Sequence, residues 1–197
     1  MLLCDWSSDV CSSDLRVYSV SVAQLPSARG DGAPVSSMIE LEAGTRLIGY
    51  VAGTVDTPLL LATSSGHGFA AVLGDMVSRQ KAGKQFITVD EGAEPLAPQR
   101  VDAATDRRIA CLSAKGRVLV FDAAEIKALA GGGRGVTLMD LDDGETLLAA
   151  VPIGSGALLR ATRGSAGKSV EVRLVGALLQ AHLGHRARKG KLVDSKL

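Results

Sequence analysis

The hydrophobic positions of this chain fall into short runs separated by turns. Two of the runs alternate apolar and polar residues, which is the period-2 signature of a half-buried β-strand. A glycine-containing turn precedes three of the runs, as in a hairpin. Local helix is expected only at Ala123–Leu129, about two turns at most. Four runs share this layout: Val17–Val22, Gly68–Leu73, Arg117–Phe121 and Ser169–Leu174.

A basic, glycine-containing element follows each of the four runs. The four elements are Leu25–Gly32, Ser78–Lys84, Ala130–Gly135 and His185–Lys191. Their final glycines are separated by 51, 52 and 55 residues, and an acidic Gly turn ends nine residues after the second and third of them. Such a period indicates a repeat built from similar β-units. The sequence therefore predicts an all-β domain of about four roughly four-stranded blades with a period of about 50 residues.

The first fifteen residues do not follow this pattern. Asp5–Leu15 reads Asp-Trp-Ser-Ser-Asp-Val-Cys-Ser-Ser-Asp-Leu, which matches the translation of a widely used short-read sequencing adapter in one frame. The stretch has neither the cationic nor the apolar region of a secretory signal. We interpret residues 1–15 as a non-native leader that adds nothing to the packed fold. The domain is assigned to residues 16–197, with a first blade that lacks its opening strand.

Charge and composition narrow the function classes. The whole chain has 22 Lys and Arg against 21 Asp and Glu, but the leader holds three of the acidic residues and no basic one. From Ala157 onward there are nine basic and two acidic residues. Only six residues are aromatic, which argues against a protein that stacks single-stranded bases. No apolar run approaches the roughly 18 residues of a membrane span. Cys111, the one cysteine outside the leader, lies in an apolar run and is expected to be buried.

Motifs that could carry chemistry are incomplete. Arg163–Ser169 resembles the end of a phosphate-binding P-loop, but Thr162 occupies the position of its first glycine and a strand follows in place of a helix. His182 and His185 have no Cys or carboxylate at zinc-ligand spacing, so we expect a polar loop. The acidic run Asp140–Asp143 lacks the calcium-loop pattern and is interpreted as a solvated turn. We assign no catalytic residue, cofactor or metal site.

The basic elements are similar to a known motif. They resemble degenerate copies of the Gln-Arg-Arg-Gly-Gly-Lys-Gly box of gyrase A, and Leu25–Gly30, Asp75–Arg79 and Gly133–Val136 look close to topoisomerase IV sequence. The chain thus resembles the C-terminal β-pinwheel domain of bacterial type IIA topoisomerases, from the subunit that carries the catalytic tyrosine. Because no box is intact, the resemblance favours topoisomerase IV (its ParC chain) over gyrase A.

The resemblance implies an accessory domain that binds double-stranded DNA without sequence specificity. The whole enzyme would use Mg²⁺ and ATP, assemble from a ParC dimer and the ATPase chain ParE, and support decatenation and relaxation in the bacterial cytoplasm. The catalytic tyrosine of the family lies outside this domain. Two alternatives stay open: a gyrase A domain that wraps DNA, and a propeller-like protein-interaction module.

A basic loop in each blade would place positive charge at regular intervals along one edge. Such an edge can hold the phosphates of a duplex without reading its bases. We also expect the glycines to let backbone N–H groups approach phosphates closely. The expected DNA-binding residues are Arg29, Arg79, Lys81, Lys84, Arg134, Arg186, Arg188, Lys189 and Lys191.

Overall fold

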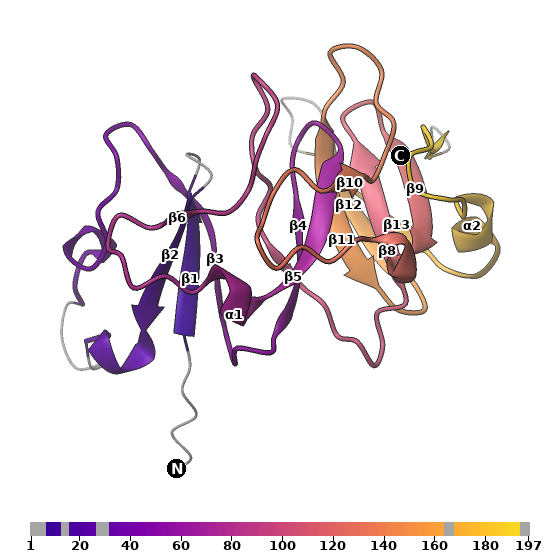
Figure 1. The fold of residues 1–197 in the computed structure, drawn as a ribbon. Helices are drawn as coiled ribbons and strands as arrows, with labels where there is room; N and C mark the ends of the chain where they lie inside the picture. The colour runs from indigo at the N-terminus through magenta and orange to yellow at the C-terminus, as the bar shows by residue number, and fades with distance from the viewer. Residues whose placement is uncertain (1–6, 13–15, 27–31, 164–167, 194–197) are drawn as a thin grey trace.

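The computed structural model describes residues 7–12, 16–26, 32–163 and 168–193. Antiparallel hairpins form successive blades side by side (Figure 1). Blades 1 to 3 are four-stranded sheets, with strand orders β3-β1-β2-β6, β10-β5-β4-β7 and β11-β8-β9-β14, whereas blade 4 is the pair β12-β13. The all-β prediction and its blade architecture are confirmed.

The strand bounds follow the repeat. The central hairpins are β1 (Ser7–Ser12) with β2 (Arg16–Ser21), β4 (Pro58–Ala62) with β5 (His67–Val72), β8 (Arg108–Ser113) with β9 (Arg117–Asp122), and β12 (Ala157–Arg163) with β13 (Lys168–Leu174). The flanking strands are β3 (Leu47–Gly53), β6 (Lys84–Gln85), β7 (Gln99–Arg100), β10 (Val136–Thr137), β11 (Leu147–Ile153) and β14 (Lys191–Leu192).

Each of the first three blades takes one strand from the following repeat. β6 pairs with β2, β10 with β5 and β14 with β9, all antiparallel. Each of these short strands begins directly after the final glycine of a basic element: Gly83, Gly135 or Gly190. The 50-residue period therefore marks the point where the chain returns to the preceding blade.

The hydrophobic core lies between neighbouring blades. Val17 and Val51 of blade 1 pack with Leu59 and Phe69 of blade 2. A second cluster joins blade 2 to blade 3, and a third extends from blade 3 to Leu174 and Leu179. Apolar side chains on both faces of blades 2 and 3 are buried for this reason, which explains their continuous apolar strands.

The expectation that the leader stays outside the fold is wrong for Ser7–Ser12. These residues form β1, which pairs with β2 on one side and β3 on the other. Strand pairing uses backbone N–H and C=O groups that every residue except proline supplies, so a polar segment can fill the position. Blade 1 thereby obtains the opening strand that we expected it to lack, and Trp6 lies outside the described residues.

Helices are few and short. A 3₁₀ turn at Ala123–Glu125 replaces the two helical turns that we expected at Ala123–Leu129, because the chain then extends along blade 2 and Ala128 bridges to Ala70. Further helical turns are η1 (Val22–Gln24), η2 (Val35–Ser37), α1 (Leu73–Met76) and α2 (Gly176–Ala181). No helix in the described part of the chain is long and apolar enough to cross a membrane.

Candidate nucleic-acid interface

The basic elements occupy equivalent positions at the hairpin-turn end of blades 1 to 3. In each case a backbone N–H close to the acidic turn donates to a carbonyl of the next basic element. The three bonds run from Glu40 to Lys81 (2.9 Å), from Thr88 to Gly133 (3.0 Å) and from Asp140 to Arg188 (3.1 Å). We call this end of blades 1 to 3, with its hairpin turns, acidic turns and basic elements, the turn edge. The repeat is thus preserved at the level of individual hydrogen bonds.

The final glycine of each basic element is required for docking on the preceding blade. Gly83, Gly135 and Gly190 have φ values of 70°, 82° and 69°. A Cβ at Gly135 would lie 2.2 Å from the Gly68 carbonyl oxygen, and one at Gly190 would lie 2.6 Å from that of Val118. These glycines therefore face protein backbone, which corrects the interpretation that they admit phosphates.

The acidic turns form ion pairs along the same edge. The first residue of the second hairpin strand meets a carboxylate in each of the three blades. The distances are 3.6 Å for Arg16 to Glu42, 3.4 Å for His67 to Asp90 and 3.0 Å for Arg117 to Asp142. The interpretation of Asp140–Asp143 as a solvated turn is therefore wrong at Asp142, because strand exchange brings cations against it.

Asp142 gathers the largest group of cations. Besides Arg117, its carboxylate contacts Lys115 at 3.2 Å and pairs with Lys189 of the basic element. Hydrogen bonds from Lys189 and Lys115 lower the pKa of Asp142 to about 2, and the carboxylate in turn raises the pKa of Lys189. Lys115 also lies 3.8 Å from the buried carboxylate of Glu145. The predicted DNA-binding residue Lys189 is thus engaged within the protein.

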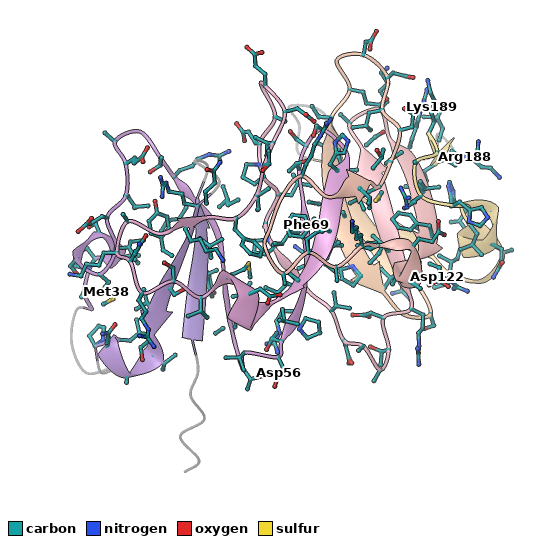
Figure 2. All side chains as sticks on the ribbon, in the orientation of Figure 1. Met38, Asp56, Phe69, Asp122, Arg188 and Lys189 are labelled. Atoms are coloured by element: carbon teal, nitrogen blue, oxygen red, sulfur yellow. The ribbon has the colours of Figure 1, made fainter. Side chains whose placement is uncertain are left out.

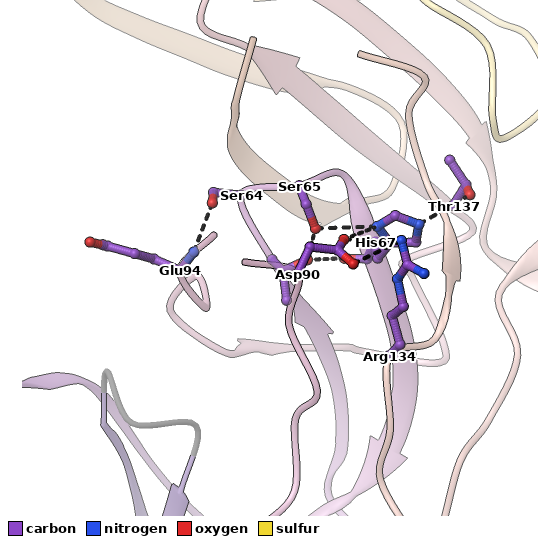
Figure 3. A network of polar contacts seen from close by, with 8 residues as sticks. Ser64, Ser65, His67, Asp90, Glu94, Arg134 and Thr137 are labelled. Atoms are coloured by element: carbon purple, nitrogen blue, oxygen red, sulfur yellow. Dashed lines mark hydrogen bonds and ion pairs between the residues drawn. The ribbon is translucent and has the colours of Figure 1, made fainter. Parts of the chain in front are cut away.

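A corresponding network surrounds Asp90 (Figure 3). Arg134 contacts both Asp90 carboxylate oxygens, at 2.9 and 3.1 Å. His67 Nδ1 lies 3.2 Å from the Ser65 hydroxyl and 3.4 Å from Asp90, while its Nε2 faces Thr137. A catalytic triad places the serine and the carboxylate on opposite ring nitrogens, so this arrangement is not one.

Electrostatics in this network follow from burial and from the guanidinium. Burial, and then the charge of Arg134, lower the pKa of His67, against the opposite effect of Asp90. The hydrogen bond from Ser65, together with Arg134, lowers the pKa of Asp90. Arg134 and Asp90 therefore form an ion pair beside an imidazole that tends to stay neutral.

Three of the expected DNA-binding residues are available to a ligand. Arg79, Lys81 and Arg188 are exposed, and their side chains make no hydrogen bond or ion pair with the residues that the structure describes. Figure 2 shows Arg188 and Lys189 together on the upper side of the molecule, whereas Asp122, at the other end of the β8–β9 hairpin, lies below them. Arg29 lies outside the described residues.

The remaining expected residues are held by main-chain carbonyls. Lys84 also lies over the Phe86 ring, 5.2 Å from its centroid. The carbonyl contacts are Lys84 Nζ to Asp75 (3.0 Å), Arg186 Nη1 to Thr137 (3.3 Å) and Lys191 Nζ to Ala181 (2.8 Å). These cations help to fasten the basic elements to the blades.

Other candidate residues have structural positions. His182 is buried at the end of α2 with Nδ1 3.3 Å from the Val118 carbonyl oxygen, so the expectation of a polar loop is wrong there. Cys111 is buried as expected, and burial raises the pKa of its thiol to about 12. Within the described residues, no group of three or more His, Cys, Asp or Glu side chains could hold a metal ion.

Similarity to known proteins agrees with this geometry. Residues 108–153 match the family model of the DNA gyrase C-terminal domain, described as a β-propeller. The chain is 37% identical to the ParC chain of DNA topoisomerase 4 from Neisseria gonorrhoeae over 182 residues, which cover 90% of this chain and 23% of that protein. The structure of the Escherichia coli ParC C-terminal domain superposes with a TM-score of 0.83 at 26% identity, covering 96% of this chain and 77% of that one. The chain belongs to the gyrase A and ParC family of C-terminal domains.

Within this family the chain is more similar to topoisomerase IV relatives. It is 30% identical to the corresponding DNA topoisomerase 4 chain of Escherichia coli K12 over 90% of its length. The gyrase A C-terminal domain has a TM-score of 0.72 at 20% identity, covering 99% of this chain and 64% of that one, and shares the fold. The chain spans about a quarter of the length of the topoisomerase IV proteins that it matches (23 and 24%).

Lys115, Arg117 and Asp142 escaped sequence reasoning. Lys115 and Arg117 flank the hairpin turn between β8 and β9, and only strand exchange brings Lys189 to the same carboxylate. The recurrent spacing of the acidic turn behind the basic Gly element was the available signal. It indicates that each pinwheel blade holds cations of the next repeat through its own carboxylate.

Proposed function

We propose that this domain binds duplex DNA along the turn edge, as an accessory domain of the ParC chain of a topoisomerase IV. The observation that supports this most directly is the repeated docking of a basic element at the same end of three successive blades. We further propose that residues 16–197 are the native domain and that residues 1–15 are a non-native leader.

The available cations suit a phosphate backbone. Arg79, Lys81 and Arg188 are exposed and come from two basic elements of the repeat. Arg79 and Lys81 also line an open groove of about 500 Å³ together with Ser19, Ser21 and Gln24. Cations that neutralise phosphates bind duplex DNA by releasing counterions, and they carry no base information.

The proposal extends to the intact enzyme. There the domain would engage a duplex while a ParC dimer and the ATPase chain ParE carry out strand passage with Mg²⁺ and ATP in the bacterial cytoplasm. The chain itself would contribute phosphate contacts and no catalytic group. Its effect would be on which duplex the enzyme holds and for how long.

The test compares two triple variants by fluorescence anisotropy with a labelled duplex at several salt concentrations. Each lost phosphate contact lowers the slope of log affinity against log salt by roughly 0.9. The variant Arg79→Gln, Lys81→Gln, Arg188→Gln should therefore lower the slope by about 2 to 3.

The matched control is Arg107→Gln, Arg108→Gln, Arg173→Gln. It removes the same charge at the opposite end of the blades, since Arg108 pairs with Asp122 and Arg173 lies near the end of β13. Its slope should change by less than about 1. Equal losses in both variants would contradict a turn-edge site, and an absence of binding by the unmodified chain would favour a protein-interaction module.

A further inference from the structure

Three cations from three separate segments converge on the carboxylate of Asp142. Lys115 belongs to the hairpin turn, Arg117 is the first residue of β9, and Lys189 comes from the basic element of the next repeat. The side chains of Lys115 and Lys189 are about half exposed, at 49 and 54%. The cluster is therefore open to solvent on the face that the basic element presents.

The acidic turn is fixed in place from below. The Asp142 N–H donates to Glu145 Oε2 at 3.1 Å, and the Glu145 side chain is fully buried. Its other oxygen, Oε1, is buried without a hydrogen-bond partner among the described residues. The position of the Asp142 carboxylate among the cations thus depends on the turn and not on the cations alone.

A carboxylate with two oxygens bound by several cations has the same contacts as the two non-bridging oxygens of a phosphodiester. We propose that Lys115, Arg117 and Lys189 form a phosphate-binding site for duplex DNA in which Asp142 occupies the anion position. Asp142 then competes with DNA for the three cations. This inference rests on the proposed function and adds Lys115 and Arg117 to the residues that contact phosphate.

The same arrangement in the preceding blade supports the idea of an internal competitor. Asp90 holds Arg134 of the next basic element through both carboxylate oxygens. Blade 2 carries His67 where blade 3 carries Arg117, so its site has fewer permanent cations. Release of Asp142 should consequently free more positive charge than release of Asp90.

The experiment compares Asp142→Asn with Asp143→Asn in the full chain, using anisotropy with a duplex of about 30 base pairs. Asp143 is the matched control because it is adjacent, exposed and makes no ion pair in the described structure. Both variants remove one negative charge from the same turn, so only the release of bound cations differs. Asp142→Asn should tighten binding about tenfold at 0.1 M salt and increase the salt slope by about 1 to 2. Asp143→Asn should tighten binding less than about threefold.

A second pair of variants tests the site directly and does not depend on the folding of Asp142→Asn. Lys115→Gln should lower the salt slope by roughly 0.9, whereas Lys127→Gln, another exposed cation without a side-chain partner among the described residues, should lower it much less. Equal effects of Lys115→Gln and Lys127→Gln, or of a folded Asp142→Asn and Asp143→Asn, would overturn the inference. If the unmodified chain bound no DNA, the proposed function itself would fail.

Discussion

At the scale of single residues, glycines of the same sequence type have two different roles. Gly135 combines a φ of 82° with close approach to the Gly68 carbonyl oxygen of the preceding blade. Gly144 of the acidic turn has a similar φ of 71°, but nothing lies within 4 Å of the position of a Cβ. Both need a left-handed backbone, and only the first also needs the absence of a side chain.

We therefore predict that Gly135→Ala destabilises the domain more than Gly144→Ala. The strain of a left-handed alanine costs about 1 kcal/mol in both. The clash at Gly135 adds to it and should bring its loss of unfolding free energy to about 3 kcal/mol. Urea unfolding followed by circular dichroism would measure both variants, and equal losses would show that the strand-exchange glycine is not required for docking.

His67 gives the turn edge a pH-dependent stability. Its pKa is lowered in the folded state, chiefly by burial, so the unfolded chain takes up the proton first. The free energy of unfolding should be unaffected above about pH 6.5 and should fall as the pH drops below that value.

The variant His67→Gln should remove this fall. Urea unfolding at pH 7.5, 6.5 and 5.5 would compare it with the unmodified chain, with His185→Gln as the control because the His185 side chain is 84% exposed. A fall of the same size in His67→Gln and in the unmodified chain would show that other groups cause it.

At the scale of elements, β1 shows how little side-chain information a strand position can require. It lies between β2 and β3, and neither of these strands pairs with the other. Ser7–Ser12 is polar apart from Val10 and Cys11, yet it pairs with both neighbours through the backbone. The element is therefore defined by the unpaired edges of its neighbours more than by its own residues.

We predict that deletion of residues 1–15 exposes the amides of β2 and β3 that face β1. Hydrogen exchange should speed up there and stay unchanged in β8 and β9, which lie two blades away. Replacement of residues 1–15 by an unrelated polar segment of the same length with strand-forming residues should restore protection. Unchanged exchange in β2 and β3 after deletion would mean that β1 contributes nothing in solution.

At the scale of the whole molecule, each blade depends on its neighbours. Phe69 of blade 2 lies 5.8 Å, between ring centroids, from Phe86, which follows the strand that blade 1 receives. Exchanged strands and inter-blade cores together fix the spacing of the turn edge. That spacing allows cations from successive repeats to meet one continuous line of phosphates.

Because this edge offers phosphate contacts, we predict that the domain binds unrelated duplexes of equal length with affinities within about threefold of one another. Competition of two unlabelled duplexes of different sequence against one labelled duplex would measure the difference. A difference of more than about a hundredfold would indicate base contacts and contradict an interface made of phosphate contacts alone.

The sequence by itself determined the repeat, the all-β class and the basic elements. Alternating strands, glycine spacing and charge are local properties, so they can be read along the chain. The positions of Gly83, Gly135 and Gly190 even marked where strands are exchanged, although their role was assigned to phosphate.

Only the tertiary structure decided which cations are available and what fills blade 1. Lys189 and Arg134 differ from Arg188 because carboxylates of the preceding blade lie beside them, more than 40 residues away in sequence. The strand position at Ser7–Ser12 likewise depends on the open edges of β2 and β3. Ion pairing and strand pairing are set by distances between segments, and those distances exist only once the blades have packed.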